Sequence, residues 1–218
     1  MAEYTWSYSS LKQYQNCPKQ YYEVTVSKNF FQPPSKEMIY GNEVHHALEL
    51  YVKEGKELPK NYQRYKEQVD VLVDIPGEKL TEHRMALTKD RTSCSYGAKE
   101  RWVRGIADLL ILDGDHAFII DYKTGGTKYP DPKQLRLMSL MTFAHFPEVK
   151  KVKAGLLFVA HNYFIPEEYK REDIEKSWGL FTGVLTRLDN SFDTNTWQPN
   201  PTPLCKFCPV KSCEFNNR

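Results

Sequence analysis

The stretch from Trp102 to Gly126 constrains the fold of this chain more than any other. Two runs rich in apolar and β-branched residues flank the pair Gly114-Asp115, and a two-residue loop with glycine first is typical of a tight β-hairpin. Counting back from this loop along both strands puts Asp108 directly opposite Asp121. The sequence therefore predicts two neighbouring carboxylates inside an otherwise apolar pair of strands.

Directly opposed side chains have Cβ atoms roughly 4.5–5.5 Å apart, and like charges placed in this way are destabilising. A divalent cation between Asp108 and Asp121 removes the conflict, because Mg²⁺ and similar hard cations prefer carboxylate oxygens. Side chains alternate along a strand, so Lys123 shares the face of Asp121 while Tyr122 points the other way. This face is predicted to hold two carboxylates and one ammonium group.

A different interpretation of the two acids stays open at this point. Asp108 or Asp121 can instead end a strand and form an ion pair with Arg101 or Arg104. The register is the step on which the metal site depends, because a slip of one residue would separate the two carboxylates.

The remaining chain predicts alternating helices and strands. Apolar residues recur at helical spacing from Lys36 until Gly55, and His45 lies on that apolar stripe. The order of elements indicates an α/β (α+β) domain with a mixed central sheet. The other expected elements are a short helix from Ser9 or Ser10 that Pro18 interrupts, a weaker helix at 61–73, a strand at 79–87, a helix from Asp131, a strand at 152–164 and a long helix within 166–190.

Composition narrows the class of protein without identifying a partner. The 30 basic and 28 acidic side chains leave a formal charge of +2, so a nucleic-acid site would have to come from local clusters. A chain of 218 residues is expected to form one domain. No run of apolar residues is long enough to cross a membrane, and no signal-peptide core occurs near the start, so we expect a soluble, cytoplasmic protein.

Five cysteines in an intracellular protein do not suggest a disulfide framework. Three of them, Cys205, Cys208 and Cys213, form a C-x2-C-x4-C cluster, and Cys17 is the obvious fourth ligand. Four thiolates suit either a structural zinc ion or a 4Fe–4S cluster, and the chemistry alone slightly favours zinc. Cys94 lies outside the cluster and is expected to be a free thiol.

These motifs resemble the PD-(D/E)XK nuclease superfamily and, more narrowly, its RecB-like branch. The matching pieces cover residues 41 to 138 in the family's order. They are the G-x-x-x-H of Gly41 to His45, then Glu82, the G-x-x-D of Gly105 to Asp108, the D-x-K of Asp121 to Lys123, and Gln134. The sequence departs from the branch at Met138, where a tyrosine is usual.

The resemblance implies a restriction-endonuclease-like fold and a role for each matched residue. His45, Asp108, Asp121 and the backbone carbonyl of Tyr122 would bind Mg²⁺ or Mn²⁺. Lys123 would orient the attacking water or stabilise developing charge. Glu82 would be an accessory acid, and Gln134 would touch the DNA backbone or position Lys123. His46 and Glu78 are the neighbouring alternatives to His45 and Glu82.

The cysteine arrangement is similar to that of iron–sulfur members of the branch, which include the AddB nuclease domain and CRISPR-associated exonucleases. This similarity favours 4Fe–4S over zinc, with residues 1–35 and 196–218 clasping a nuclease core at 36–190. It implies a DNA exonuclease that acts on single-stranded ends with 5′-to-3′ preference in recombination, repair or degradation. A CRISPR adaptation nuclease that trims spacer precursors, a virus-encoded enzyme and a non-catalytic DNA-binding module are the alternatives.

Overall fold

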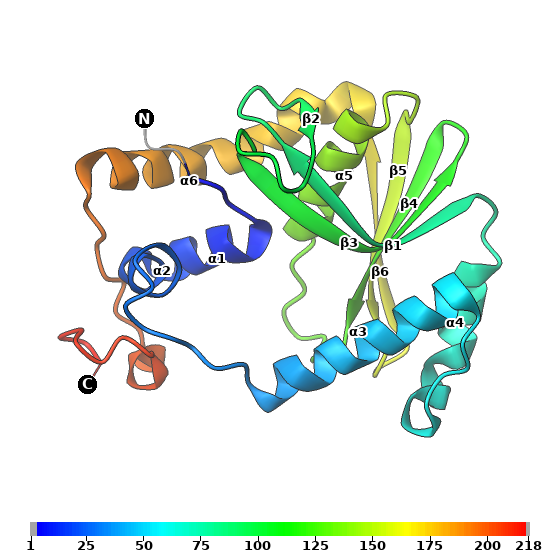
Figure 1. The fold of residues 1–218 in the computed structure, drawn as a ribbon, viewed down its shortest axis with the longest axis horizontal. Coiled ribbons are helices and arrows are strands. Elements are labelled where there is room, and N and C mark those ends of the chain that lie inside the picture. Colours follow the sequence, from blue (N-terminus) through cyan, green and yellow to red (C-terminus); the bar gives the residue numbers. More distant parts are fainter. Residues whose placement is uncertain (1–3, 217–218) are drawn as a thin grey trace. The chain divides into compact units, whose positions relative to one another are not determined.

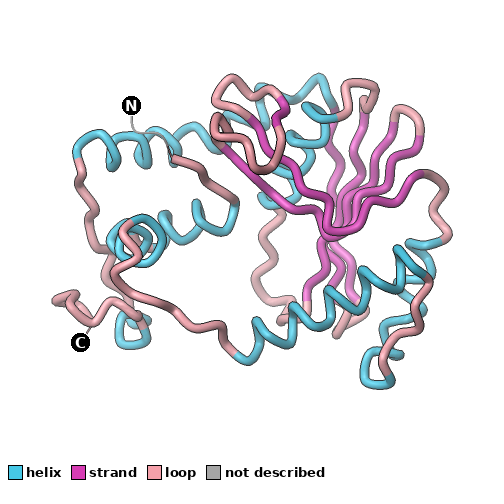
Figure 2. Tube along the Cα trace, in the orientation of Figure 1, coloured by secondary structure: helices cyan, strands magenta, loops and turns pink. Residues whose placement is uncertain are grey.

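The computed structural model describes residues 4–216 (Figures 1 and 2). The chain divides into two compact units, each described here by itself. One unit is the continuous segment Ser35–Ser177, and the other combines residues up to Pro34 with those from Trp178 onward. The first unit holds the sheet, and the second unit holds the cysteines other than Cys94.

A six-stranded sheet in the order β2-β1-β3-β4-β5-β6 forms the centre of the first unit. Its strands are magenta in Figure 2. All neighbouring strands are antiparallel except β4 and β5, which are parallel, so the mixed sheet expected from the sequence is present. The strands are β1 (Glu78–Leu87), β2 (Ser93–Cys94), β3 (Val103–Asp113), β4 (His116–Lys123), β5 (Lys151–Phe158) and β6 (Tyr163–Lys170).

The hairpin between β3 and β4 has the predicted loop and the predicted register. Gly114 adopts a φ of 59°, the left-handed conformation that glycine adopts without steric cost. Asp113 pairs with His116, and the ladder continues to Leu109 opposite Ile120. The next position in this register places Asp108 beside Asp121, at the point where the two strands reach the candidate site.

Helices cover both faces of the sheet. On one face lie α3 (Lys36–Glu54), the 3₁₀ turn η2 (Lys60–Tyr65) and α4 (Lys66–Val73), and α5 (Lys133–His145) packs on the other (Figure 1). Helix α3 begins at the cap Ser35, whose side chain accepts a hydrogen bond from the Met38 amide, and ends at Gly55 with φ 66°. The core between α3, α4 and the sheet contains Val44, Leu48, Val69, Leu109, Ile111, Ile120 and Tyr122.

The second unit is helical and rich in aromatic contacts. Its elements are α1 (Tyr8–Asn16), α2 (Pro18–Tyr21), the π-helical turn η1 (Tyr22–Val26), the part of α6 (Ile174–Thr194) from Trp178 onward, and the 3₁₀ turn η4 (Pro203–Phe207). Ser7, rather than Ser9 or Ser10, caps α1. The rings of Tyr14, Tyr21, Tyr22 and Phe192 all contact Trp197.

One sequence-based expectation is wrong in the segment after α5. The predicted strand at 152–164 is two strands, because the chain turns at Asn162, which has a φ of 47°. Pro166 lies in the edge strand β6, where a residue without an amide hydrogen is tolerated. The long helix predicted within 166–190 is present. The 3₁₀ turn η3 (Arg171–Asp173) follows β6, and α6 then begins at Ile174.

Within residues 4–216, no helix combines the length and the apolar character needed to span a membrane.

Candidate metal centre

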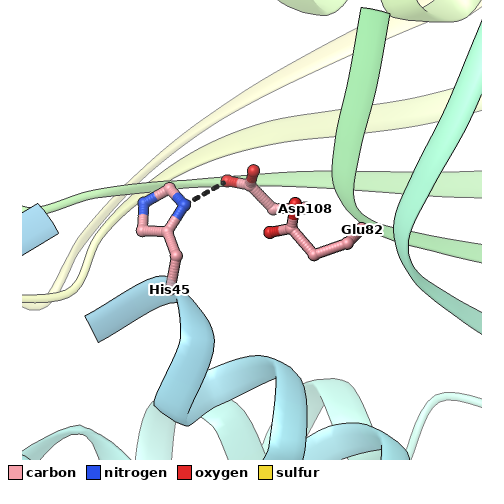
Figure 3. Close-up of side chains that lie close together, drawn as sticks. All are labelled: His45, Glu82 and Asp108. Carbon is pink, nitrogen blue, oxygen red and sulfur yellow. Dashed lines mark ion pairs between the residues drawn. The ribbon is translucent and has the colours of Figure 1, made fainter. Parts of the chain in front are cut away.

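Three candidate ligands from different elements lie close together (Figure 3). His45 comes from α3, Glu82 from β1 and Asp108 from β3, and one possible ligand atom of each lies within 4.8 Å of the others. The neighbouring His46 is exposed and pairs with Glu49, with 3.3 Å between its Nδ1 and the carboxylate Oε2. The structure thus groups His45 and Glu82, rather than His46, with Asp108.

Two contacts fix the Asp108 carboxylate. Its Oδ2 atom lies 3.4 Å from His45 Nδ1 and accepts a hydrogen bond of 2.8 Å from the backbone amide of Tyr122. The side chain of Tyr122 instead packs in the core beside α3, with its ring centroid 5.9 Å from that of His45. Tyr122 can therefore offer only its backbone to the centre.

Asp121, Lys123 and Gln134 form a second connected group. The ammonium of Lys123 lies 2.5 Å from Asp121 Oδ2 and donates a hydrogen bond of 3.2 Å to Gln134 Oε1. The amide nitrogen of Gln134 in turn donates to Asp121 Oδ1 at 2.6 Å. One glutamine side chain from α5 therefore orients both the carboxylate and the ammonium of the D-x-K motif.

The pKa values of the acids reflect their burial and their mutual repulsion. Burial and the charge of Asp108 raise the pKa of Asp121, which is 6% exposed, to about 6, although Lys123 and His45 oppose the shift. Burial, followed by the charge of Asp108, also raises the pKa of Glu82. The positive groups nearby thus do not fully neutralise Asp108, Asp121 and Glu82. A cation bound between these carboxylates would reduce their mutual repulsion.

The pKa of His45 changes in the direction expected beside carboxylates. Burial alone would lower it, but the hydrogen bond and charge of Asp108, with smaller contributions from Asp121 and Glu82, raise it. His45 therefore responds to the same excess of negative charge as the acids.

The donor set fits a divalent cation. Carboxylate oxygens are the ligands that Mg²⁺ and Mn²⁺ prefer, and imidazole is a common ligand of transition metals. Asp121 Oδ2 is buried and accepts no hydrogen bond of good geometry despite its close contact with Lys123. His45, Asp108, Glu82 and Asp121 are thus the residues that could hold a metal.

Backbone strain at Glu82 was not visible in the sequence. Glu82 has a φ of 47°, which is sparsely populated by residues other than glycine. Strained residues of this kind often occur at functional sites, where the surrounding structure stabilises them. Glu82 lies in the middle of β1, and a residue at such a position is expected to have an ordinary extended backbone.

The unusual Met138 has a packing role in α5. A Cβ atom added at Gly105 would lie 2.2 Å from the terminal methyl of Met138, so the absence of a side chain on β3 lets α5 approach. Gly41 in α3 is similarly close, since an added Cβ would lie 3.2 Å from Thr124 Oγ1, directly after Lys123. Both motif glycines therefore allow a helix to approach the strands that carry the site.

The two arginines proposed as alternative partners of the acids have other contacts. The Arg101 guanidinium donates to the carbonyls of Gly97 and Ala98, and the Arg104 guanidinium stacks near the ring of Tyr96. The acids lie instead against His45 and Lys123, as described above.

Four cysteines of the second unit line one small cavity: Cys17, Cys205, Cys208 and Cys213. The backbone amides of Asn200 and Thr202 donate to the sulfurs of Cys17 and Cys205, at 3.4 and 3.3 Å. Burial raises the pKa of the Cys208 thiol, with further contributions from the other three cysteines. In the described part of the chain, no three cysteine sulfurs lie within 4.8 Å of one another. Cys94 is in β2, in the other unit.

The mixed sheet with helices on both faces is consistent with a restriction-endonuclease-like fold. The structure is similar to that of the protein SSO0001, with a TM-score of 0.51 and 15% identity over 99% of this chain and 89% of that chain. It is also similar to a candidate exonuclease from Eubacterium rectale, with a TM-score of 0.54 and 12% identity over 94% and 87% of the two chains. At such identities the likeness shows a shared fold alone.

The model of the PD-(D/E)XK nuclease superfamily matches residues 5–213, so this chain belongs to that superfamily. Members of the superfamily are nucleases that use divalent metal ions. No curated protein matches the chain at a significant level.

Proposed function

We propose that this protein is a metal-dependent deoxyribonuclease that acts as an exonuclease on single-stranded DNA ends, with 5′-to-3′ preference. The observation that carries the proposal is the convergence of His45, Glu82 and Asp108 next to the Asp121–Lys123 pair. A bound Mg²⁺ or Mn²⁺ would stabilise negative charge on the scissile phosphate and promote ionisation of water.

Each residue of the centre has a separate role in this proposal. His45, Asp108, Asp121 and the Tyr122 carbonyl hold the cation, and Glu82 adds an accessory carboxylate. Lys123 orients the attacking water or stabilises charge on the phosphate, because its ammonium is one-third exposed while its position is fixed by Gln134. Gln134 acts as a positioning residue, since it contacts both Asp121 and Lys123.

Resemblance and exposed aromatic side chains support a single-stranded substrate. Tyr129 is 82% exposed in the loop that follows Lys123, and Lys128 lies beside its ring, so this loop can stack a base next to a positive charge. In the other unit, Phe31 is 80% exposed. The preference for ends and the 5′-to-3′ direction rest on the iron–sulfur branch that the sequence resembles.

For the cysteine cavity, we propose a 4Fe–4S cluster held by Cys17, Cys205, Cys208 and Cys213. The arrangement of one upstream cysteine and three near the C-terminus is similar to that of the iron–sulfur branch, and this resemblance favours the cluster over zinc. The role is structural, because the four ligands come from both ends of the described chain.

Absorption spectra and iron and zinc analysis of anaerobically purified protein test the cluster. Cys17→Ser should lose the iron chromophore and lower the melting temperature, while Cys94→Ser, which changes a cysteine outside the cavity, should do neither. One zinc ion per chain without iron would contradict the 4Fe–4S assignment.

The decisive assay of the activity uses 5′-labelled and 3′-labelled single strands with Mn²⁺, for wild type and Asp121→Ala. Early release of mononucleotides from the 5′-labelled strand alone would support the proposed polarity, and loss in the variant would support the site. Asp113→Ala, an exposed acid of the same hairpin, is the control. Equal cleavage by Asp121→Ala would refute the site, and binding without cleavage by wild type would indicate a non-catalytic DNA-binding module.

The cellular process is a separate part of the proposal. The candidate roles are those of a recombination or repair nuclease, a virus-encoded nuclease and a nuclease that trims CRISPR spacer precursors. The neighbouring genes would distinguish among these roles.

A further inference from the structure

Two exposed arginines share one tyrosine ring on the sheet unit. The guanidinium carbons of Arg84 and Arg104 lie 5.5 and 5.7 Å from the centroid of the Tyr96 ring. Arg84 is on β1 and Arg104 on β3, and these strands pair so that Arg84 faces Ile106 while Arg104 faces Ala86. The two arginines are therefore diagonal neighbours on adjacent strands, and both lie near the half-buried ring of Tyr96.

Neither guanidinium is neutralised. Within residues 4–216, no carboxylate forms an ion pair with Arg84 or Arg104, whereas Arg91, from the same β1–β3 connection, binds Glu175 with 2.8 Å between nitrogen and oxygen. A cation over an aromatic face gains favourable energy and loses part of its freedom before any ligand binds. The pair is thus two preordered, unpaired positive charges on an exposed surface.

The pair lies along the strands that lead to the metal centre. Arg84 is two residues from Glu82 on β1, and Arg104 is four residues from Asp108 on β3. At about 3.3 Å per residue, these separations are about 7 and 13 Å along the strands.

We propose that Arg84, Arg104 and Tyr96 form a clamp for the backbone phosphates of a nucleic-acid strand, next to the phosphate that is cleaved. This inference rests on the proposed nuclease function and adds to it a substrate-binding site. Guanidinium groups present forked donors that match phosphate oxygens. Phosphate contacts fix the position of a strand without reading its sequence, so the clamp contributes to binding and register irrespective of base.

The first test measures binding of a fluorescein-labelled single strand in EDTA, which prevents cleavage, at several salt concentrations. Arg84→Ala and Arg104→Ala should each weaken binding up to about fivefold, the size expected for an exposed charge pair. Each should also reduce the slope of log affinity against log salt by about 0.7. Arg91→Ala removes the same charge from the same segment, but its guanidinium already has a partner, so binding should be nearly unchanged.

Substitutions of Tyr96 distinguish a clamp, which needs the ring, from a general attraction between the arginines and DNA, which does not. Tyr96→Leu keeps both arginines but removes their common support, and it should weaken binding about as much as the loss of one arginine. Tyr96→Phe keeps the ring and should bind like wild type. In cleavage assays with Mn²⁺, the arginine variants should raise KM with little change in kcat, and melting curves confirm that each variant is folded.

The clamp is overturned if both arginine variants bind and cleave like Arg91→Ala, even when wild type is an active nuclease. If wild type binds with the predicted dependence on both arginines but does not cleave, the clamp is supported and the nuclease proposal is refuted. Absence of binding by wild type overturns both. A dependence on the arginines for duplex but not for single strands would contradict the single-stranded substrate.

Discussion

Replacing Asp121 by asparagine should make the metal-free protein more stable at neutral pH while abolishing cleavage. The pKa of Asp121 is raised from 3.8 to about 6, a difference of about 2 units, because burial and Asp108 disfavour its ionised form. Each unit corresponds to 1.36 kcal/mol, so ionisation in the folded state costs about 3 kcal/mol. Since the folded pKa is the higher one, this cost is absent below pH 3.8, grows as the pH rises towards 6 and is complete above it.

The net gain is smaller than the full cost, because Lys123 loses its partner in the variant. Lys123 is one-third exposed, so water replaces part of that contact, and the asparagine oxygen still accepts from Gln134. We expect a gain of about 1–2 kcal/mol, which corresponds to a rise in melting temperature of about 2–8 °C for a chain of this size.

Thermal unfolding in EDTA between pH 4 and pH 7.5 checks this prediction. The advantage of Asp121→Asn over wild type should vanish near pH 4 and be largest at pH 7.5, and added Mn²⁺ should stabilise wild type more than the variant. Asp113→Asn, at the exposed end of β3 in the same hairpin, should show neither effect. A variant that is equally stable or less stable than wild type at every pH would refute the electrostatic argument.

Three further substitutions test the site and its packing. His45→Ala should raise the Mn²⁺ concentration needed for half-maximal cleavage, while His46→Ala, which removes the exposed neighbour, should leave it unchanged; equal effects would contradict the assignment of His45. Gln134→Ala should lower kcat about 10- to 100-fold without removing stabilisation by Mn²⁺, since it frees Lys123 and Asp121 but deletes no ligand. Gly105→Ala should destabilise the fold by about 1 kcal/mol in thermal unfolding, because its Cβ would meet Met138 and Met141, and combining it with Met138→Ala should cost less than the sum of the two single changes.

The hairpin could be predicted because its information is local. Gly114-Asp115 sets the loop, the loop sets the register, and the register places Asp108 beside Asp121. The motif spacing likewise placed His45 on a helix that begins and ends where its capping residues indicate. These features depend on residues close together in the sequence, where chain geometry leaves few alternatives.

Other features depend on contacts that the sequence does not reveal. The apolar residues up to Val159 continue past the end of β5, so periodicity gave no sign of the turn at Asn162 or of the edge strand that contains Pro166. The left-handed backbone of Glu82 is imposed by its surroundings, and nothing in its residue type indicates it. The stacking of Arg84 and Arg104 on Tyr96 joins two strands and a loop, which became visible only in three dimensions.

The discontinuity of the helical unit has a consequence for biosynthesis. The segment Ser35–Ser177 contains every strand of the sheet, so it can begin to fold as soon as it has left the ribosome. The cysteine cavity is lined by Cys17, which is made before the sheet, and by Cys213, which is made after it. Translation therefore orders assembly, with the sheet complete before the four cysteines can meet. Loading of the proposed cluster would then be a late step of maturation, and a chain interrupted before Cys205 would contain the residues around Asp121 without the complete cysteine cavity.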